Sequence, residues 1–190
     1  VFLCASTREG EEALILDAWR QSADKPAGAL LLLVPRHPQR FDEVASLVTA
    51  RGMSLARRSQ LDPEHAIDGA DVLLGDSMGE MFAYYAACDC AYIGGSLLPL
   101  GGQNLIEACA LGKPVLVGEH TFNFLDATIE AVDDGAALRV PDAGALVHEA
   151  TRLLRDHAAR MEMGAKALAF ARRHRGATLR TVELLQRVIR

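Results

Sequence analysis

Polar residues and glycines that could bind a ligand follow directly after apolar stretches at five places in the sequence. Two Gly-Gly pairs stand close together at 94–95 and 101–102, and glycine weakens regular structure. The pairs therefore indicate either a tight turn or a backbone that a ligand approaches closely. Arg36 could pair with a phosphate or carboxylate group, or it could be an ordinary surface arginine. The five groups cover residues 6–11, 35–38, 76–80, 94–104 and 119–124.

Two further side chains could take part in nucleotide chemistry. The carboxylate of Glu107 could accept hydrogen bonds from a ribose diol, and His120 could transfer a proton or be a plain loop histidine. No Walker loop and no G-x-G-x-x-G is present, so a mononucleotide fits better than a dinucleotide. We find no local signature of a nucleophile with its base and no metal-binding pattern, so we expect no metal and no cofactor. The residues indicate group transfer from a nucleotide-activated molecule.

Three of the polar groups also fit the sequence pattern of a helix start. Ser6 and Ser77 each precede a glutamate by three residues, as in a capping box, and Asn104 precedes Glu107 in the same way. His37, followed by Pro38, is predicted to lie at the beginning of a helix. Helix N-termini also bind anions, so capping and ligand binding remain compatible readings.

The elements that position these groups alternate between short apolar runs and longer helical patterns. The runs lack polar alternation, which predicts strands buried on both faces of a parallel sheet. The sequence therefore predicts an α/β fold, a Rossmann-like, doubly wound sheet with helices on both faces. In such sheets ligands bind beyond the carboxyl ends of the strands, where the five polar groups fall. The predicted strands are 1–5, 29–34, 71–76, 90–95, 114–118 and 136–140, and the predicted helices are 11–21, 39–51, 78–88, 104–112 and 123–135.

The last stretch, 142–190, is predicted to be mostly helical, with Gly164 and Gly176 as possible breaks. From Thr151 onward it holds 10 Lys and Arg residues but only 3 Asp and Glu residues. This excess indicates either solvated helix faces or a surface that meets anionic lipid or an anionic substrate. The chain as a whole has a net charge of −5, which argues against nucleic-acid binding.

Composition predicts a single domain over residues 1–190, since half of the 190 residues are apolar and can form one core. The four cysteines lie in apolar stretches, which predicts buried, reduced thiols. No apolar run is long enough to span a bilayer. The chain opens on a strand-like run without an initiator methionine, so we expect it to be a piece of a longer protein.

Five segments in a fixed order resemble the C-terminal half of the 3-deoxy-D-manno-octulosonic acid (Kdo) transferases. The resemblance covers the chain up to about Val140 and implies one half of a glycosyltransferase B fold. It also implies that this half binds CMP-Kdo. The missing N-terminal half would bind a lipid A precursor and supply the catalytic base. The segments are ASTREGEE, LLLVPRHPQRF, GDSMGEM, GGSLLPLGGQNLIEA and HTFNF.

The same resemblance implies inverting transfer of Kdo in lipopolysaccharide biosynthesis, at the cytoplasmic face of the bacterial inner membrane. The fragment by itself would be soluble and inactive, with no catalytic residue of its own; contact with the membrane surface is possible. The sequence departs from the family pattern at Arg8 and Gln103, where histidine is expected, and at Ser77, where threonine is expected. The residues that match the donor-binding segments are Pro35, Arg36, Met78, Gly79, Glu80, Asn104, Leu105, Ile106 and Glu107.

Two other kinds of protein remain open from the residues alone. The first is another glycosyltransferase, or a sugar-nucleotide epimerase, with the same architecture but a different nucleotide. The second is a non-catalytic α/β interaction domain, which would bind no nucleotide.

Overall fold

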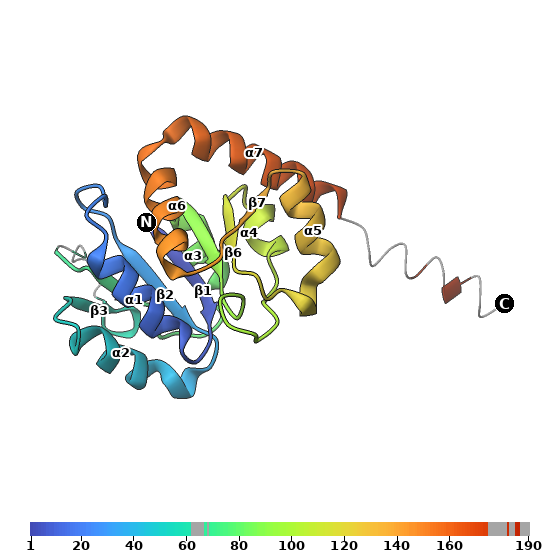
Figure 1. Cartoon of the computed structure of the whole chain (residues 1–190). Coiled ribbons are helices and arrows are strands. Elements are labelled where there is room, and N and C mark those ends of the chain that lie inside the picture. The colour runs from blue at the N-terminus through green and yellow to red at the C-terminus, as the bar shows by residue number, and fades with distance from the viewer. Residues whose placement is uncertain (62–66, 68, 175–181, 183–184, 187–190) are drawn as a thin grey trace.

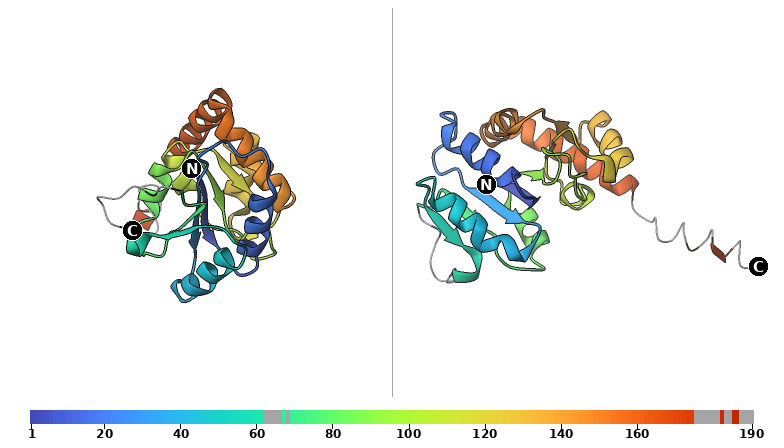
Figure 2. Two further views of the ribbon diagram at one scale, coloured as in Figure 1. Left: turned by 90° about the vertical axis from the view of Figure 1, so that its left-hand side faces the viewer. Right: turned by 60° about the horizontal axis from the view of Figure 1, so that its bottom comes forward.

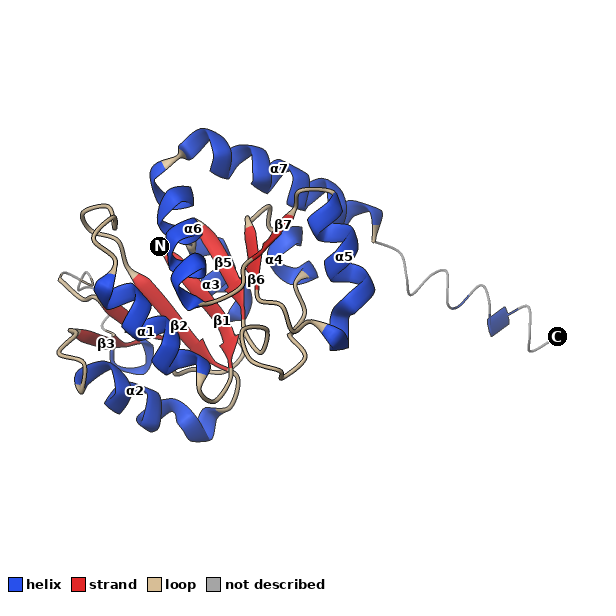
Figure 3. Ribbon diagram, in the orientation of Figure 1, coloured by secondary structure: helices blue, strands red, loops and turns tan. Residues whose placement is uncertain are grey.

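The computed structural model describes residues 1–61, 67, 69–174, 182 and 185–186 of the chain. Seven parallel strands form one sheet in the order β3-β4-β2-β1-β5-β6-β7, with helices on both faces (Figure 1; Figure 3). This confirms the predicted fold class. The strands are β1 (Phe2–Thr7), β2 (Leu31–Pro35), β3 (Leu55–Arg57), β4 (Val72–Leu74), β5 (Cys90–Ile93), β6 (Val115–Val117) and β7 (Ala137–Arg139).

The strands are apolar throughout because alternate side chains enter two separate cores. In β2, Leu31 and Leu33 point to one face of the sheet and Leu32 points to the other. Helices α1, α2 and α6 cover the first face, and α3, α4, α5 and α7 cover the second (Figure 2). The helices are α1 (Glu11–Gln21), α2 (Phe41–Thr49), α3 (Met81–Ala87), α4 (Ile106–Ala110), α5 (Leu125–Asp133), α6 (Ala143–Arg155) and α7 (His157–Arg173).

Three short 3₁₀ turns complete the described elements: η1 (Pro38–Arg40), η2 (Arg58–Gln60) and η3 (Phe122–Phe124). η1 begins after His37, which confirms the helix start predicted there. β3 was not predicted, because its three residues are half-buried at the edge of the sheet and form no apolar run.

Gly164 does not break a helix, contrary to the prediction. It lies inside α7 and is buried, and a β-carbon there would collide with the carbonyl oxygen of Gly112. The glycine therefore lets α7 approach the turn after α4. The break falls at Asp156, whose carboxylate caps α7 by accepting from the Ala159 N–H at 2.9 Å. Gly176 lies outside the described residues.

All four cysteines are buried and unpaired, as predicted. Burial raises the pKa of Cys88 to about 12, so this thiol stays protonated at neutral pH. Among the helices that the structure describes, none combines the length and the apolar character needed to cross a membrane.

Candidate functional site

A cavity of about 320 Å³ opens at the carboxyl ends of β1, β2, β4 and β5. It brings together seven of the nine residues that the resemblance selected, although they come from three separate loops. Leu105 and Ile106 are the two that do not line it. Leu105 is buried in the core, and Ile106 packs against that core from the first turn of α4. The seven are Pro35, Arg36, Met78, Gly79, Glu80, Asn104 and Glu107.

Arg36 lies at the rim of this cavity with an exposed side chain. Its backbone N–H donates to the Thr7 carbonyl at 2.9 Å, which fixes the loop after β2 against the end of β1. Within the described part of the chain its guanidinium forms no ion pair. Arg40, four residues later, differs because it binds Glu12 at 2.6 Å and Glu43 at 2.7 Å. The charge of Arg36 is therefore available to an anionic ligand.

Glu80 lines the same cavity and is bound by three neighbouring side chains. Its carboxylate accepts hydrogen bonds from Ser77 and from the Tyr84 hydroxyl at 3.3 Å, and it pairs with Arg58 at 2.8 Å. The Ser77 hydrogen bond, followed by Arg58, lowers the pKa of Glu80. The predicted capping box is wrong here, because α3 starts at Met81 without a side-chain cap and Ser77 binds the carboxylate instead.

The segment that leads to Glu80 begins with a buried aspartate, Asp76, which pairs with the partly exposed Arg57. Asp76 pairs with Arg57 at 2.7 Å and accepts from the N–H and the hydroxyl of Ser59 at 2.8 Å and 2.6 Å. Burial alone would raise the pKa of Asp76, but the Ser59 hydrogen bonds and Arg57 lower it below its usual value. β3 and η2 thus supply two arginines that hold the Asp76–Glu80 segment.

Asn104 forms a local hydrogen-bonded turn just before α4, next to the cavity. Its side-chain oxygen accepts from the Ile106 N–H at 3.0 Å, and its amide group donates to Glu107 Oε1 at 3.2 Å. The predicted capping box is nevertheless wrong here too, because the N-cap of α4 is Leu105 and the helix has no side-chain cap. The second carboxylate oxygen of Glu107, Oε2, receives no hydrogen bond from the described residues.

The glycine pairs pack protein loops together rather than opening space for a ligand. A β-carbon on Gly94 would collide with the carbonyl oxygen of Ser6, and one on Gly102 would lie 3.4 Å from Thr121 Cα. Gly102 also has a φ of 75°, which L side chains rarely adopt. Neither glycine lines the cavity; that wall is formed by Gln103 and Asn104, the next two residues.

The Ser6–Glu9 capping box is also wrong. α1 begins at Glu11, as predicted, but its N-cap is Gly10 without a side-chain cap, and the Arg8 N–H donates to Glu11 Oε2 at 2.9 Å. Ser6 has a φ of 56° and lines the cavity. A non-glycine residue in this region is strained, which is frequent at functional sites.

Eight cavity residues are not among the nine matched donor-binding residues. Their signal is weak because tyrosine, serine and phenylalanine in apolar segments are read as core or caps. Phe124 belongs to the quoted HTFNF segment, to which no role was given. Ser6, Ser77, Gln103 and Phe124 lie in the polar groups predicted to bind a ligand, whereas Val34, Met81, Tyr84 and Tyr85 were not singled out.

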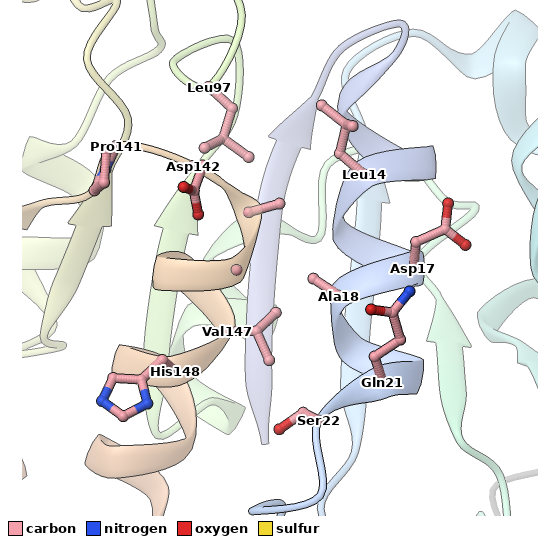
Figure 4. Close-up of a pocket in the computed structure, with 12 residues that line it drawn as sticks. Leu14, Asp17, Ala18, Gln21, Ser22, Leu97, Pro141, Asp142, Val147 and His148 are labelled. Carbon is pink, nitrogen blue, oxygen red and sulfur yellow. The ribbon is translucent and has the colours of Figure 1, made fainter.

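A larger groove of about 560 Å³ lies between α1 and α6 (Figure 4). Its carboxylates are already engaged: Asp17 pairs with Arg51 at 2.8 Å, and Asp142 caps α6 through the Ala145 N–H at 2.8 Å. Figure 4 shows that its walls are side chains of these two helices, together with Leu97, Pro141 and Asp142 from loops. We therefore place the candidate site in the smaller cavity, where polar groups from three segments converge and where Arg36 and one oxygen of Glu107 have no partner among the described residues. The described residues contain no group of three or more His, Cys, Asp or Glu side chains suited to a metal ion.

Comparison with known proteins defines the class of the chain. The sequence model of the family described as "Glycosyl transferases group 1" matches residues 15–170. Anabaena Alr3699/HepE, solved with UDP and glucose, superposes with a TM-score of 0.64 at 18% identity over 98% of this chain and 47% of its own. That likeness supports the fold alone, and with the family match it defines a glycosyltransferase domain.

More similar proteins narrow this class. The chain is 50% identical to the Kdo transferase of Bordetella pertussis and 37% identical to that of Haemophilus influenzae, over 98% of its length in each case. It spans less than half of these relatives, 44% and 43%. The C-terminal CMP-Kdo binding domain of WaaA from Acinetobacter baumannii superposes with a TM-score of 0.82 at 35% identity, over 89% of this chain and 87% of that domain. The chain therefore belongs to the Kdo transferases.

Proposed function

We propose that the cavity binds CMP-Kdo and that the chain is the donor half of an inverting Kdo transferase. The whole protein would add Kdo to a lipid A precursor in lipopolysaccharide biosynthesis. The observation that carries this proposal is the convergence of seven matched residues on one cavity at the carboxyl edge of the sheet. The Acinetobacter domain, which is described as a CMP-Kdo binding domain, supports the choice of nucleotide.

The charges of the cavity suit this donor. CMP-Kdo carries one phosphate and one carboxylate group, and Arg36 supplies a guanidinium without an ion pair among the described residues. Glu107 offers a free carboxylate oxygen to the ribose hydroxyls. The proposed donor site keeps all nine matched residues: Pro35, Arg36, Met78, Gly79, Glu80, Asn104, Leu105, Ile106 and Glu107.

We assign no catalytic residue to this chain. The relatives indicate a whole protein of about twice this length. Its other half would bind the lipid acceptor and supply the general base. The 190-residue chain alone would therefore bind donor without transferring it. The whole protein would act at the cytoplasmic face of the bacterial inner membrane.

A thermal-shift screen with CMP, UDP, ADP and GDP tests the proposal. CMP at one hundred times its Kd should stabilise the chain by about 2.7 kcal/mol, which corresponds to a rise in Tm of roughly 5–10 °C. UDP, ADP and GDP should change Tm much less. A response to UDP rather than CMP would indicate another glycosyltransferase or an epimerase. No response to any nucleotide would favour an interaction domain.

A further inference from the structure

Two adjacent glutamates begin α1 and are both completely buried. Glu11 and Glu12 belong to the ASTREGEE segment, but neither lines the cavity. Burying a carboxylate is costly unless hydrogen bonds or a cation compensate it. Two buried carboxylates at neighbouring positions, close to a ligand cavity, therefore indicate that they have a structural or functional role there.

Glu11 is held almost entirely by backbone amides. Its Oε2 accepts from the N–H groups of Arg8 at 2.9 Å and Gly95 at 2.7 Å. Its Oε1 accepts from the Leu97 N–H at 3.0 Å and from the Tyr92 hydroxyl at 2.6 Å. Burial, and then the Glu11 charge, raise the pKa of Tyr92, so the hydroxyl remains a donor. In the described residues Glu11 has no cationic partner.

These contacts fix the beginning of the glycine loop, residues 94–102. Gly95 has a φ of 73°, and its carbonyl accepts from the Gly102 N–H at 2.7 Å. Ser96 then ties the loop to the end of β6 by accepting from the Gly118 N–H at 2.8 Å. The loop leads directly into Gln103 and Asn104, which form one wall of the cavity.

Glu12 fixes the loop on the other side. Its Oε1 accepts from the Thr7 hydroxyl at 2.9 Å and pairs with Arg40 at 2.6 Å. Arg40 ends η1, four residues after Arg36. Glu12 thus ties the loop that carries Pro35 and Arg36 to the first turn of α1.

We propose that Glu11 and Glu12 are positioning residues that set the two walls of the donor cavity, Glu11 through the glycine loop and Glu12 through Arg40. The proposal rests on the proposed function for the ligand, but the contacts exist without it. A carboxylate is needed at residue 11 because it offers two acceptor oxygens to four donors. A glutamine would turn an NH₂ group toward backbone N–H groups and lose half of these bonds.

The test compares Glu11→Gln and Glu12→Gln with Ala150→Gly, a control at a buried residue of α6 that belongs to neither loop and does not line the cavity. CMP affinity is measured by calorimetry, and amide hydrogen exchange is measured without ligand. Glu11→Gln should weaken CMP binding at least tenfold and speed exchange at Gly95 and Leu97. Glu12→Gln should weaken binding about threefold to tenfold, because Arg40 keeps its second partner. Ala150→Gly should lower Tm but change affinity less than twofold.

The outcomes separate positioning from general stability. Affinity within twofold of wild type for Glu11→Gln, or a loss that Ala150→Gly reproduces at equal Tm, would overturn the proposal. If Glu11→Gln does not fold, Tyr92→Phe removes one of its four donors and should weaken CMP binding about twofold to fivefold. If the wild-type chain binds no CMP, the proposed function is refuted. Amide hydrogen exchange without ligand still tests whether Glu11 positions the glycine loop. Faster exchange at Gly95 and Leu97 only in the Glu11 variant supports positioning, and unchanged exchange refutes it.

Discussion

The cations at the cavity and those on α6 and α7 differ in what they bind. On the two helices, Arg152 pairs with Glu149 at 2.7 Å and Lys166 pairs with Glu162 at 2.7 Å. Arg160 pairs with Asp89 at 3.5 Å and donates to two carbonyls at the end of α6. Arg36, in contrast, faces the cavity rim without an ion pair in the described part of the chain.

This difference shows that the number of charges in a segment is a poor guide to a binding site. The basic excess after Thr151 is largely compensated by nearby acids where the structure describes it, which favours the reading as solvated helix faces. A single arginine at the end of a buried strand has no such compensation. Its position at the cavity is what we expect of a residue that binds an anionic ligand. The following predictions test this contrast between Arg36 and the cations of α6 and α7.

The largest expected effect comes from removing the cavity arginine. Arg36→Ala should weaken CMP binding by about 1.5–3 kcal/mol, because a charge-assisted hydrogen bond to an anionic group is lost. This corresponds to roughly a 10- to 150-fold rise in Kd by calorimetry. The matched control Arg152→Ala should leave Kd unchanged within a factor of two. Equal losses in both variants would remove the distinction between the two regions.

The ion pair between buried Asp76 and Arg57 should contribute more to stability than the exposed ion pairs do. Asp76→Asn should lower the free energy of unfolding at pH 7 by about 1–3 kcal/mol, since it weakens hydrogen bonds to a charged group. Its exposed counterpart, Asp24→Asn, breaks a 3.8 Å pair with Arg155 and should cost less than about 1 kcal/mol. Urea unfolding of both variants and wild type measures this.

The same pair predicts a pH dependence. The pKa of Asp76 is lowered in the folded chain, so its stabilisation is complete above the ordinary aspartate pKa of about 3.9. It is lost as the pH falls from there through the lower folded value. The gap between wild type and Asp76→Asn should therefore narrow below about pH 4. A gap that stays constant from pH 7 to pH 2 would contradict the lowered pKa.

Glu107 should have a smaller effect on affinity and little effect on folding. Glu107→Ala should weaken CMP binding by about 1–2 kcal/mol through loss of an acceptor for the ribose. Among the described residues, the only hydrogen bond that is lost is the 3.2 Å one from Asn104, so Tm should change little. A large fall in Tm with unchanged affinity would show that Glu107 is chiefly part of the helix start.

The smallest effect is expected on α6. Arg155 is 60% exposed and its partner Asp24 is 71% exposed, so Arg155→Ala should change the free energy of unfolding by less than about 0.5 kcal/mol. CMP affinity should be unchanged. A loss of affinity comparable to that of Arg36→Ala would show that the basic helices contribute to the ligand site.

The fold was predictable because its strands are apolar on both faces and its helices fall between them. α1 was predicted with the bounds that the structure shows. β3 was missed, since a three-residue edge strand leaves no pattern in the sequence. Gly164 was misread because its cause is a tertiary contact with Gly112, which local sequence does not contain.

The site was predictable as an edge of the sheet but not as a network. Parallel strands place their following loops together, so the polar groups could be collected before the structure was known. The residues that hold Asp76 and Glu80 were not predicted, because Arg57 and Arg58 lie in a strand and a turn that the sequence did not reveal. Glu11 was placed in the first polar group without a specific role, and two of its backbone partners come from a loop more than 80 residues away.

The most direct test of the account is a titration of the ¹⁵N-labelled chain with CMP, followed by NMR. The account predicts that the largest amide shifts fall at Arg36, at residues 77–80 and at residues 103–107. UDP at the same concentration should produce much smaller shifts. Shifts that cluster instead on the α1–α6 groove, around His148, would contradict the assignment of the donor site.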